Sequence, residues 1–262
     1  MTKEQREEIL AKGCIPVEIE GKVIALQNKE ESFKKFEEMY PGYEIVNMDK
    51  FYLLKNHGKG TPLCKTDLQD LSIIEDMERM FDHCESLESL DLSNFDTSKV
   101  KDMSGMFCCC YLLQTLDLSN FDTSNVKNMS YMFYGCTNLK TLNLSNFDTY
   151  KVESMASMFS DCKYLESLDL SNFDTSGVYT IHSMFKGCTN LKTLNLSNFD
   201  ESKIERMANM FEDCESLKTV IINKEKNPWI IKELQKLEHK VEIIEPTQKL
   251  AQGGVSECHA FG

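Results

Sequence analysis

Cysteine is the residue type in this chain whose spacing most directly suggests chemistry. Six of the eleven cysteines recur every 26 residues: Cys84, Cys110, Cys136, Cys162, Cys188 and Cys214. Such a column could bind a soft metal ion or form disulfides. In stacked repeats, however, equivalent side chains lie about 4.8 Å apart with parallel Cβ directions, which does not suit a disulfide. Since a thiol is also a good small buried side chain, we predict that this column packs in the core.

Aspartate forms a second column with the same period: Asp96, Asp122, Asp148, Asp174 and Asp200. Stacked carboxylates could coordinate calcium, as they do in β-solenoids built from Gly-rich nonapeptides with two carboxylates per turn. Here Thr or Glu follows each aspartate, and the motif contains no glycine. We therefore predict that these side chains accept hydrogen bonds from free backbone amides where the next segment begins.

Two further cysteine groups stand outside the column. The triplet Cys108-Cys109-Cys110 adds two thiols, which we interpret as surface or accidental thiols and not as a metal site, because no histidine or C-x-x-C pair supports one. Cys258-His259 could pair a nucleophile with a base, but catalysis needs a base that is held in position. Motifs for a nucleophile elbow, a phosphate loop or a metalloprotease are also absent from the sequence. We predict a protein that is not an enzyme and that uses no cofactor or metal.

The elements that position these residues come from one repeat. The nonapeptide LDLSNFDTS occupies residues 90–98, 116–124 and 168–176, and close variants occupy 142–150 and 194–202. Met-Phe pairs recur with the same period, without an insertion, from Met80-Phe81 to Met210-Phe211. An unbroken period of this size indicates a solenoid, in which each unit buries its apolar face only against its neighbours.

Each unit predicts a strand followed by helical structure. In one unit Leu142 and Leu144 are two residues apart, so they share one face of a short strand. Val152, Met155 and Met158 then follow three-residue spacing, which predicts a short helix or a run of helical turns. This second half of the unit varies more between repeats than the strand does.

Two polar rows accompany the predicted strands. One row lies between strand and turn, where a stacked amide can satisfy buried backbone groups: Asn94, Asn120, Asn146, Asn172 and Asn198. The other row faces outward and is our candidate concave binding surface: Asp91, Asp117, Asn143, Asp169 and Asn195. This surface is nearly the same in every turn and lacks the aromatic or arginine anchors of an irregular epitope. It either meets a repetitive ligand or serves mainly to keep the sheet soluble.

The pattern L-x-x-L-x-L-S-N-F-D-T-S-x-V-x-x-M-x-x-M-F-x-x-C resembles the leucine-rich repeats of the bacterial BspA-like class, in particular their 26-residue version, a Mycoplasma-type domain of unknown function. The resemblance covers roughly residues 66 to 223. It implies an α/β leucine-rich-repeat solenoid of about six turns. It also implies adhesion or another molecular interaction without enzyme activity, and a surface or secreted location is typical of the class.

The sequence divides into four parts. Residues 1–62 predict a small α/β unit of helix, two strands, amphipathic helix and strand, which either caps the solenoid or forms a separate recognition module. The solenoid covers residues 63–223. Strand, helix and strand end the repeats, so residues 224–245 form a C-terminal cap in which Trp229 is available as a plug. Residues 246–262 predict a flexible tail.

The charge of the chain restricts its partners. With 42 acidic and 29 basic residues the formal net charge is −13, which disfavours nucleic acid and membrane surfaces and favours a basic or neutral protein partner. The sequence shows no signal-peptide run, lipobox or wall-sorting motif, and no stretch long enough to span a bilayer. We expect a cytoplasmic monomer.

Three functions remain open, and we favour a non-enzymatic macromolecular interaction scaffold. In the first alternative the repeats are the leader of a modified-peptide precursor, whose core follows Gly253-Gly254 and contains Ser256, Cys258 and His259. In the second alternative the chain is a phage or mobile-element protein that binds and inhibits a host protein.

Overall fold

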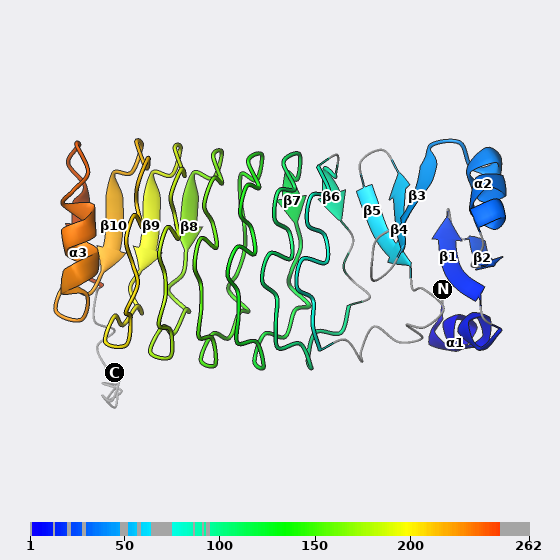
Figure 1. Ribbon diagram of the computed structural model, residues 1–262, viewed down its shortest axis with the longest axis horizontal. Coiled ribbons are helices and arrows are strands. Elements are labelled where there is room, and N and C mark those ends of the chain that lie inside the picture. The colour runs from blue at the N-terminus through cyan, green and yellow to red at the C-terminus, as the bar shows by residue number, and fades with distance from the viewer. Residues whose placement is uncertain are drawn as a thin grey trace, which may run out of the picture.

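The structure is a computed structural model, and it describes residues 2–12, 14–19, 22–27, 30–47, 52–56, 59–63, 75–85, 87–90, 92 and 95–246. Its main body is a parallel β-solenoid of about six turns with little helix. Figure 1 shows the turns stacked along the long axis of the molecule, with an α/β unit at one end and a helix at the other. The solenoid predicted from the 26-residue period is confirmed.

The described residues of the N-terminal unit form two helices and five strands: α1 (Lys3–Ala11), β1 (Cys14–Ile19), β2 (Lys22–Gln27), α2 (Glu30–Met39), β3 (Tyr43–Asn47), β4 (Tyr52–Asn56) and β5 (Lys59–Leu63). β1 and β2 form an antiparallel hairpin, and β3, β4 and β5 form an antiparallel meander. The single strand predicted across residues 43–55 is wrong. Asn47 pairs with Tyr52 in an antiparallel register, so this segment forms two strands, β3 and β4.

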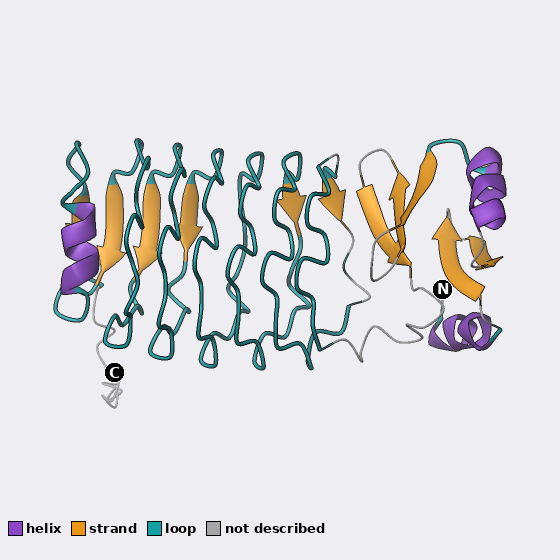
Figure 2. Ribbon diagram, viewed as in Figure 1, coloured by secondary structure: helices purple, strands orange, loops and turns teal. Residues whose placement is uncertain are grey.

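The first halves of the repeats form two sheets that run along the stack (Figure 2). Their strands are β6 (Ser89–Leu90), β7 (Thr115–Leu116), β8 (Ser167–Asp169), β9 (Thr193–Leu196) and β10 (Thr219–Ile222). β5 of the N-terminal unit pairs in parallel with β6, which continues the meander into the solenoid. The strand predicted at Leu142 and Leu144 is not formed, although Leu144 is buried in the core like its equivalents.

The second half of each unit is not helical, which corrects the prediction drawn from the three-and-four spacing. Alternate backbone amides bond to the next turn, as Phe81 N–H does to Met106 O at 2.8 Å, and a row of parallel bridges runs from Asp76 to Arg206. Two left-handed residues, four positions apart, interrupt any right-handed helix in each turn: 79 and 83, 105 and 109, 131 and 135, 157 and 161, 183 and 187, 209 and 213. Short backbone turns within each repeat therefore bring apolar residues inward at the same three- and four-residue spacing as a helix.

The core is built from columns of identical side chains. The phenylalanines of the Met-Phe pairs stack face to face from Phe81 to Phe211, with ring centroids 5.5–5.8 Å apart. The six cysteines are buried beside them, and the Cys162 thiol donates to the carbonyl of Phe133 at 3.1 Å. Core packing of the cysteine column is confirmed.

Polar side chains link each turn to the next. Asn146 Nδ2 donates to the carbonyls of Leu118 and Phe121, each at 2.9 Å, and equivalent bonds confirm the predicted role for Asn120, Asn172 and Asn198. Asn94 lies outside the described residues. Thr149 Oγ1 donates to the carbonyl of Asp174 at 2.9 Å and accepts from its N–H at 2.8 Å. The Asp174 carboxylate accepts from Ser176 N–H at 2.8 Å. The aspartates therefore hold tight turns, as acceptors of backbone amides, and start no helix.

The C-terminal end contains α3 (Pro228–Leu234) and β11 (Glu242–Ile244), and β11 pairs in parallel with β10. Ile230 and Leu234 of α3 are buried against the last turn. The predicted role of Trp229 as a plug is wrong, because its side chain is 53% exposed. On this short helix the residue that follows it, Ile230, faces the core instead.

Glu201 joins the last repeat to α3. It occupies the position of Thr149 and Thr175 in earlier turns, and its longer side chain reaches the first turn of the helix. The buried carboxylate accepts from Trp229 N–H at 2.8 Å and from Ile230 N–H at 3.0 Å. These amides have no partner within a helix, so the carboxylate supplies the acceptors that the helix start requires.

We predict that Glu201→Thr, which restores the residue of the earlier repeats, loosens α3 and lowers the free energy of unfolding by about 1–3 kcal/mol. The threonine is too short to reach either amide. Hydrogen exchange at Trp229 and Ile230 should accelerate, and fluorescence of the single tryptophan should report the change. Thr175→Ser in the preceding turn keeps its hydroxyl and serves as the control. Unchanged exchange at both amides would contradict this role for Glu201.

Candidate functional site

The outward row predicted as a binding surface is engaged in local turns. Each side-chain oxygen accepts from the backbone N–H two residues later, at 2.9–3.1 Å: Asp117, Asn143, Asp169 and Asn195. The Ser119 backbone N–H lowers the pKa of Asp117 by stabilising its carboxylate. Asp91 lies outside the described residues, as do the tail residues Gly253, Gly254, Ser256, Cys258 and His259. These side chains give the row a structural role in the turns.

A hollow of about 610 Å³ lies on the second halves of the repeats, where the sequence varies. We call it the tyrosine hollow, because Tyr131, Tyr134 and Tyr179 line it together with Arg79 and Ser130. The rings of Tyr131 and Tyr134 meet edge to face at 5.9 Å, and burial raises the pKa of Tyr134. It therefore combines aromatic and arginine side chains, the types that anchor protein interfaces.

The tyrosine hollow was not predicted from the sequence. The only signal was the variation at equivalent positions, such as Gly105, Tyr131 and Ser157, which is also what drift on a solvated face produces. Tyr131 and Tyr179 belong to different repeats and occupy different positions within them. Only the stacking of the turns brings them to one hollow.

A cluster of metal-ligating side chains lies at one end of the tyrosine hollow. Single donor atoms of Asp82, Cys108 and Cys109 all lie within 4.8 Å of one another, and the two Sγ atoms are 3.5 Å apart. His83 is next to them, with Nε2 3.8 Å from Asp82 Oδ1. The interpretation of Cys108 and Cys109 as surface thiols is wrong, because their exposed fractions are 9% and 6%. A histidine also stands beside them, which the linear sequence does not show.

The electrostatics of this cluster disfavour negative charge. Burial raises the pKa of the Cys108 thiol, and the Asp82 carboxylate and the Cys109 thiol raise it further. Hydrogen bonding to Cys109 raises the pKa of Tyr111 to about 12. Asp82 Oδ1 is buried and has no hydrogen-bond partner among the described residues. The carboxylate is held by its other oxygen, 3.4 Å from Arg79 Nη1.

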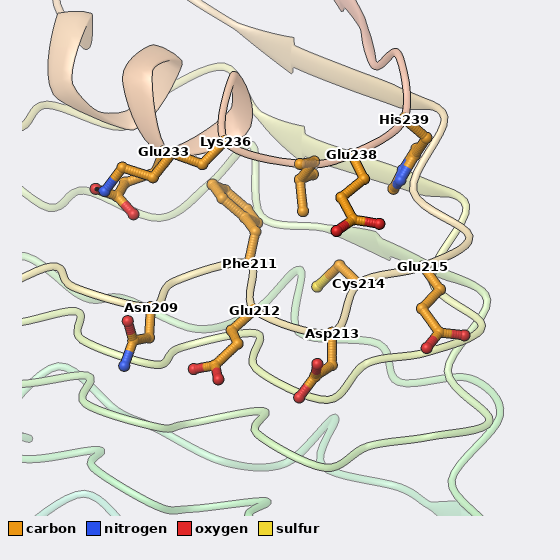
Figure 3. A pocket seen from close by; sticks show the side chains of 11 residues that line it. Asn209, Phe211, Glu212, Asp213, Cys214, Glu215, Glu233, Lys236, Glu238 and His239 are labelled. Atoms are coloured by element: carbon orange, nitrogen blue, oxygen red, sulfur yellow. Dashed lines mark hydrogen bonds and ion pairs between the residues drawn. The ribbon is translucent and has the colours of Figure 1, made fainter.

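A second hollow, of about 650 Å³, lies between the last turn and the segment that contains α3 (Figure 3). Acidic side chains from both sides line it, including Asp213, Glu215 and Glu238. The Lys186 ammonium lies 2.8 Å from Glu212, and this carboxylate raises the pKa of the lysine. His239 Nε2 is 2.7 Å from the Leu217 carbonyl. Glu212 and His239 in the lining are thus paired, and the lining contains more carboxylates than ammonium groups.

In the part of the chain that the structure describes, no helix combines the length and apolar character needed to cross a membrane.

Comparison with protein families identifies the repeats. The model described as "Mycoplasma protein of unknown function, DUF285" matches twice, over residues 62–163 and residues 136–250. The two matches overlap and together cover residues 62–250, well over half of the 262 residues. Comparisons with curated proteins and with solved structures gave no match. The chain therefore belongs to this Mycoplasma repeat family of unknown function.

Proposed function

We propose that this protein is a non-enzymatic scaffold that binds a protein partner through the tyrosine hollow. The gathering of Tyr131, Tyr134 and Tyr179 with Arg79 on the varied half of the repeats carries this proposal. Tyrosine and arginine are enriched among residues that dominate binding energy, because a ring or a guanidinium supplies a large contact area together with a polar group. The hollow spans several turns, as an interface for a folded partner requires.

The scaffold is suited to binding because it is rigid before the partner arrives. Backbone hydrogen bonds, threonine hydroxyls and asparagine amides tie successive turns together. A surface that is already ordered loses little conformational entropy on binding, so more of the contact energy contributes to affinity. Six turns at about 4.8 Å span about 29 Å, which is sufficient for an interface of standard size.

The charge of the chain favours a basic or neutral partner. Glu78 and Asp82 line the tyrosine hollow, and the acidic side chains of the hollow beside α3 add negative potential at the end of the stack. With a net charge of −13, the long-range field attracts a basic protein and raises its association rate.

We extend the proposal to the repeat class of the solenoid and to a capping role for the units at its two ends. The regular leucine, asparagine and Met-Phe columns support a leucine-rich repeat of the BspA-like class. The pairing of β5 with β6 supports a capping role for the N-terminal unit, since it continues the sheet beyond the first turn. Burial of Ile230 and Leu234 supports the same role for α3.

The binding proposal predicts a strong effect of removing two rings. Tyr131→Ala with Tyr179→Ala should weaken binding of the natural partner by about 30-fold or more, equivalent to about 2 kcal/mol. The partner is first recovered by crosslinking from a photoreactive residue placed at Ser130 in the hollow, and its affinity is then measured with purified proteins.

The matched control carries Asp117→Ala and Asn143→Ala on the outward row. The control should bind as the wild type does, after circular dichroism shows that both variants are folded. If the control loses affinity while the tyrosine variant keeps it, the partner binds the outward row and the tyrosine hollow is excluded as the site.

A further inference from the structure

The 26-residue period places two dissimilar pairs of residues in register at one end of the tyrosine hollow. Asp82 and His83 occupy the same repeat positions as Cys108 and Cys109 one turn later. His83 N–H donates to the Cys108 carbonyl at 2.8 Å, which fixes this register. Two thiols, a carboxylate and an imidazole therefore meet in space, although 24 residues separate His83 from Cys108 in the chain. We propose that Asp82, His83, Cys108 and Cys109 form a binding site for a thiophilic divalent cation of the zinc class.

The donor set and its spacing fit such an ion. Sulfur, imidazole nitrogen and carboxylate oxygen are the ligands that zinc takes in proteins, in tetrahedral geometry with Zn–S distances of about 2.3 Å. Two sulfurs on one tetrahedron are then about 3.8 Å apart, close to the 3.5 Å between Cys108 Sγ and Cys109 Sγ. The Asp82 carboxylate completes a group of three donors within 4.8 Å. The His83 side chain is 61% exposed and can turn to supply the fourth ligand.

The buried carboxylate oxygen is a second, independent indication. Asp82 Oδ1 is buried without a hydrogen-bond partner among the described residues, an arrangement that costs free energy in a folded protein. It lies beside two thiols that can lose their protons when a metal ion binds. A divalent cation would satisfy the oxygen and balance the negative charge of the thiolates formed when it binds.

The backbone supports the assignment as well. The repeat position of His83 and Cys109 is left-handed in every described turn, and later turns use Gly135, Gly187 or an aspartate there. Glycine and aspartate adopt this conformation readily, whereas cysteine does so with strain. Strained residues of this kind gather at functional sites. In the turn of Cys109 the chain thus carries a metal-ligating side chain where a less strained residue would serve the fold.

Cobalt(II) binding tests the site, because cobalt reports thiolate ligands by charge-transfer absorption and tetrahedral geometry by intense visible bands. The full-length protein is purified with a chelator and a phosphine reductant, then titrated with cobalt and back-titrated with zinc. We expect one cobalt per chain and displacement by zinc. Cys108→Ser with Cys109→Ser should weaken binding by about 100-fold or more, and His83→Ala by at least about 10-fold.

Matched controls test two thiols outside the solenoid and one carboxylate of a later turn. Cys14→Ser with Cys258→Ser should leave the cobalt spectrum unchanged, and so should Asp161→Asn at an equivalent position two turns after Cys109. An absent charge-transfer band, or a band that survives in the Cys108/Cys109 variant, would overturn the proposal. So would a wild-type protein in which the two residues stay joined as a disulfide under the reductant and take up no cobalt.

A measurement on the unmutated protein tests the site without depending on whether a variant folds. Zinc should slow alkylation of Cys108 and Cys109, mapped by mass spectrometry, and leave alkylation of Cys14 unchanged. Equal rates with and without zinc contradict the site. The metal-site proposal and the partner-binding proposal are tested independently, because the variant with Tyr131→Ala and Tyr179→Ala should bind cobalt like the wild type.

Discussion

Raising the pH from about 8 to about 10.5 is expected to unfold the solenoid, because its buried thiols remain protonated only in the folded chain. Burial is the largest cause that raises the pKa of Cys136, Cys162 and Cys188, while Cys110 is raised first by its contact with Cys84 and then by burial. Burial also raises the pKa of Cys214 to about 12.

The direction of this pH dependence follows from linkage. A thiol in the unfolded chain has a pKa of about 8.5, so above that pH the unfolded state gains free energy by ionising while the folded state does not. The stabilisation is complete below about pH 8.5 and is lost as the pH rises toward the folded-state pKa. Each thiol lowers the free energy of unfolding by about 1.4 kcal/mol per pH unit in this range, and five thiols together lower it by about 7 kcal/mol per unit. This loss is comparable with the whole stability of a domain.

A single substitution isolates this effect from other groups that titrate in alkali. At pH 7, Cys162→Ala should lower the free energy of unfolding by about 1–2 kcal/mol through lost packing. Because alanine cannot ionise, the difference from the wild type should shrink above pH 8.5 and close near pH 10. Urea denaturation at several pH values measures this difference in the free energy of unfolding. Met158→Ala, in the same turn, should show a difference that does not change with pH, and a constant difference for Cys162→Ala would contradict the prediction.

Phe159→Ala is expected to lower the free energy of unfolding by about 3–5 kcal/mol. Phe159 is fully buried and stacks between Phe133 and Phe185, with centroid distances of 5.7 Å on both sides. Removing the ring leaves a cavity that the stacked turns cannot close, since each turn is tied to both neighbours by backbone hydrogen bonds. In a solenoid this weakens two interfaces at once.

Chemical denaturation followed by circular dichroism measures the loss of free energy of unfolding caused by Phe159→Ala. Tyr150→Ala is the matched control, because this ring lies nine residues earlier and is 69% exposed, so its removal should change stability by less than about 0.5 kcal/mol. Phe159→Leu fills part of the space, so its loss of free energy of unfolding should lie between those of Phe159→Ala and Tyr150→Ala. A loss below about 1 kcal/mol for Phe159→Ala would show that the phenylalanine stack contributes little to stability.

Particular residues show why the fold was largely predictable and the site was not. Phe159 and Cys162 recur with one period, and a residue that recurs in every turn of a stack must occupy the same environment in each. Burial could therefore be read from the period. The tyrosine hollow and the cluster around Cys108 depend on residues that occur once, so no periodic signal marks them.

The second half of the repeat was assigned the wrong local structure for a physical reason. Apolar residues three and four positions apart can share a face of a helix. They can equally be brought inward by short backbone turns that contain two left-handed residues four positions apart. The choice between them depends on hydrogen bonds to carbonyls 25 residues away, as from Phe107 N–H to Met132 O at 2.9 Å. Local spacing holds no information about such partners.

The sequence by itself determined the solenoid, its period, the buried phenylalanine and cysteine columns and the role of the asparagine row, because repetition restricts each side chain to one environment. Only the tertiary structure decided which side chains meet across turns. It brought Asp82 and His83 against Cys108 and Cys109, and it brought the Glu201 carboxylate to the start of α3. These contacts depend on how one turn is registered on the next, and that register is set by backbone hydrogen bonds between residues far apart in the chain.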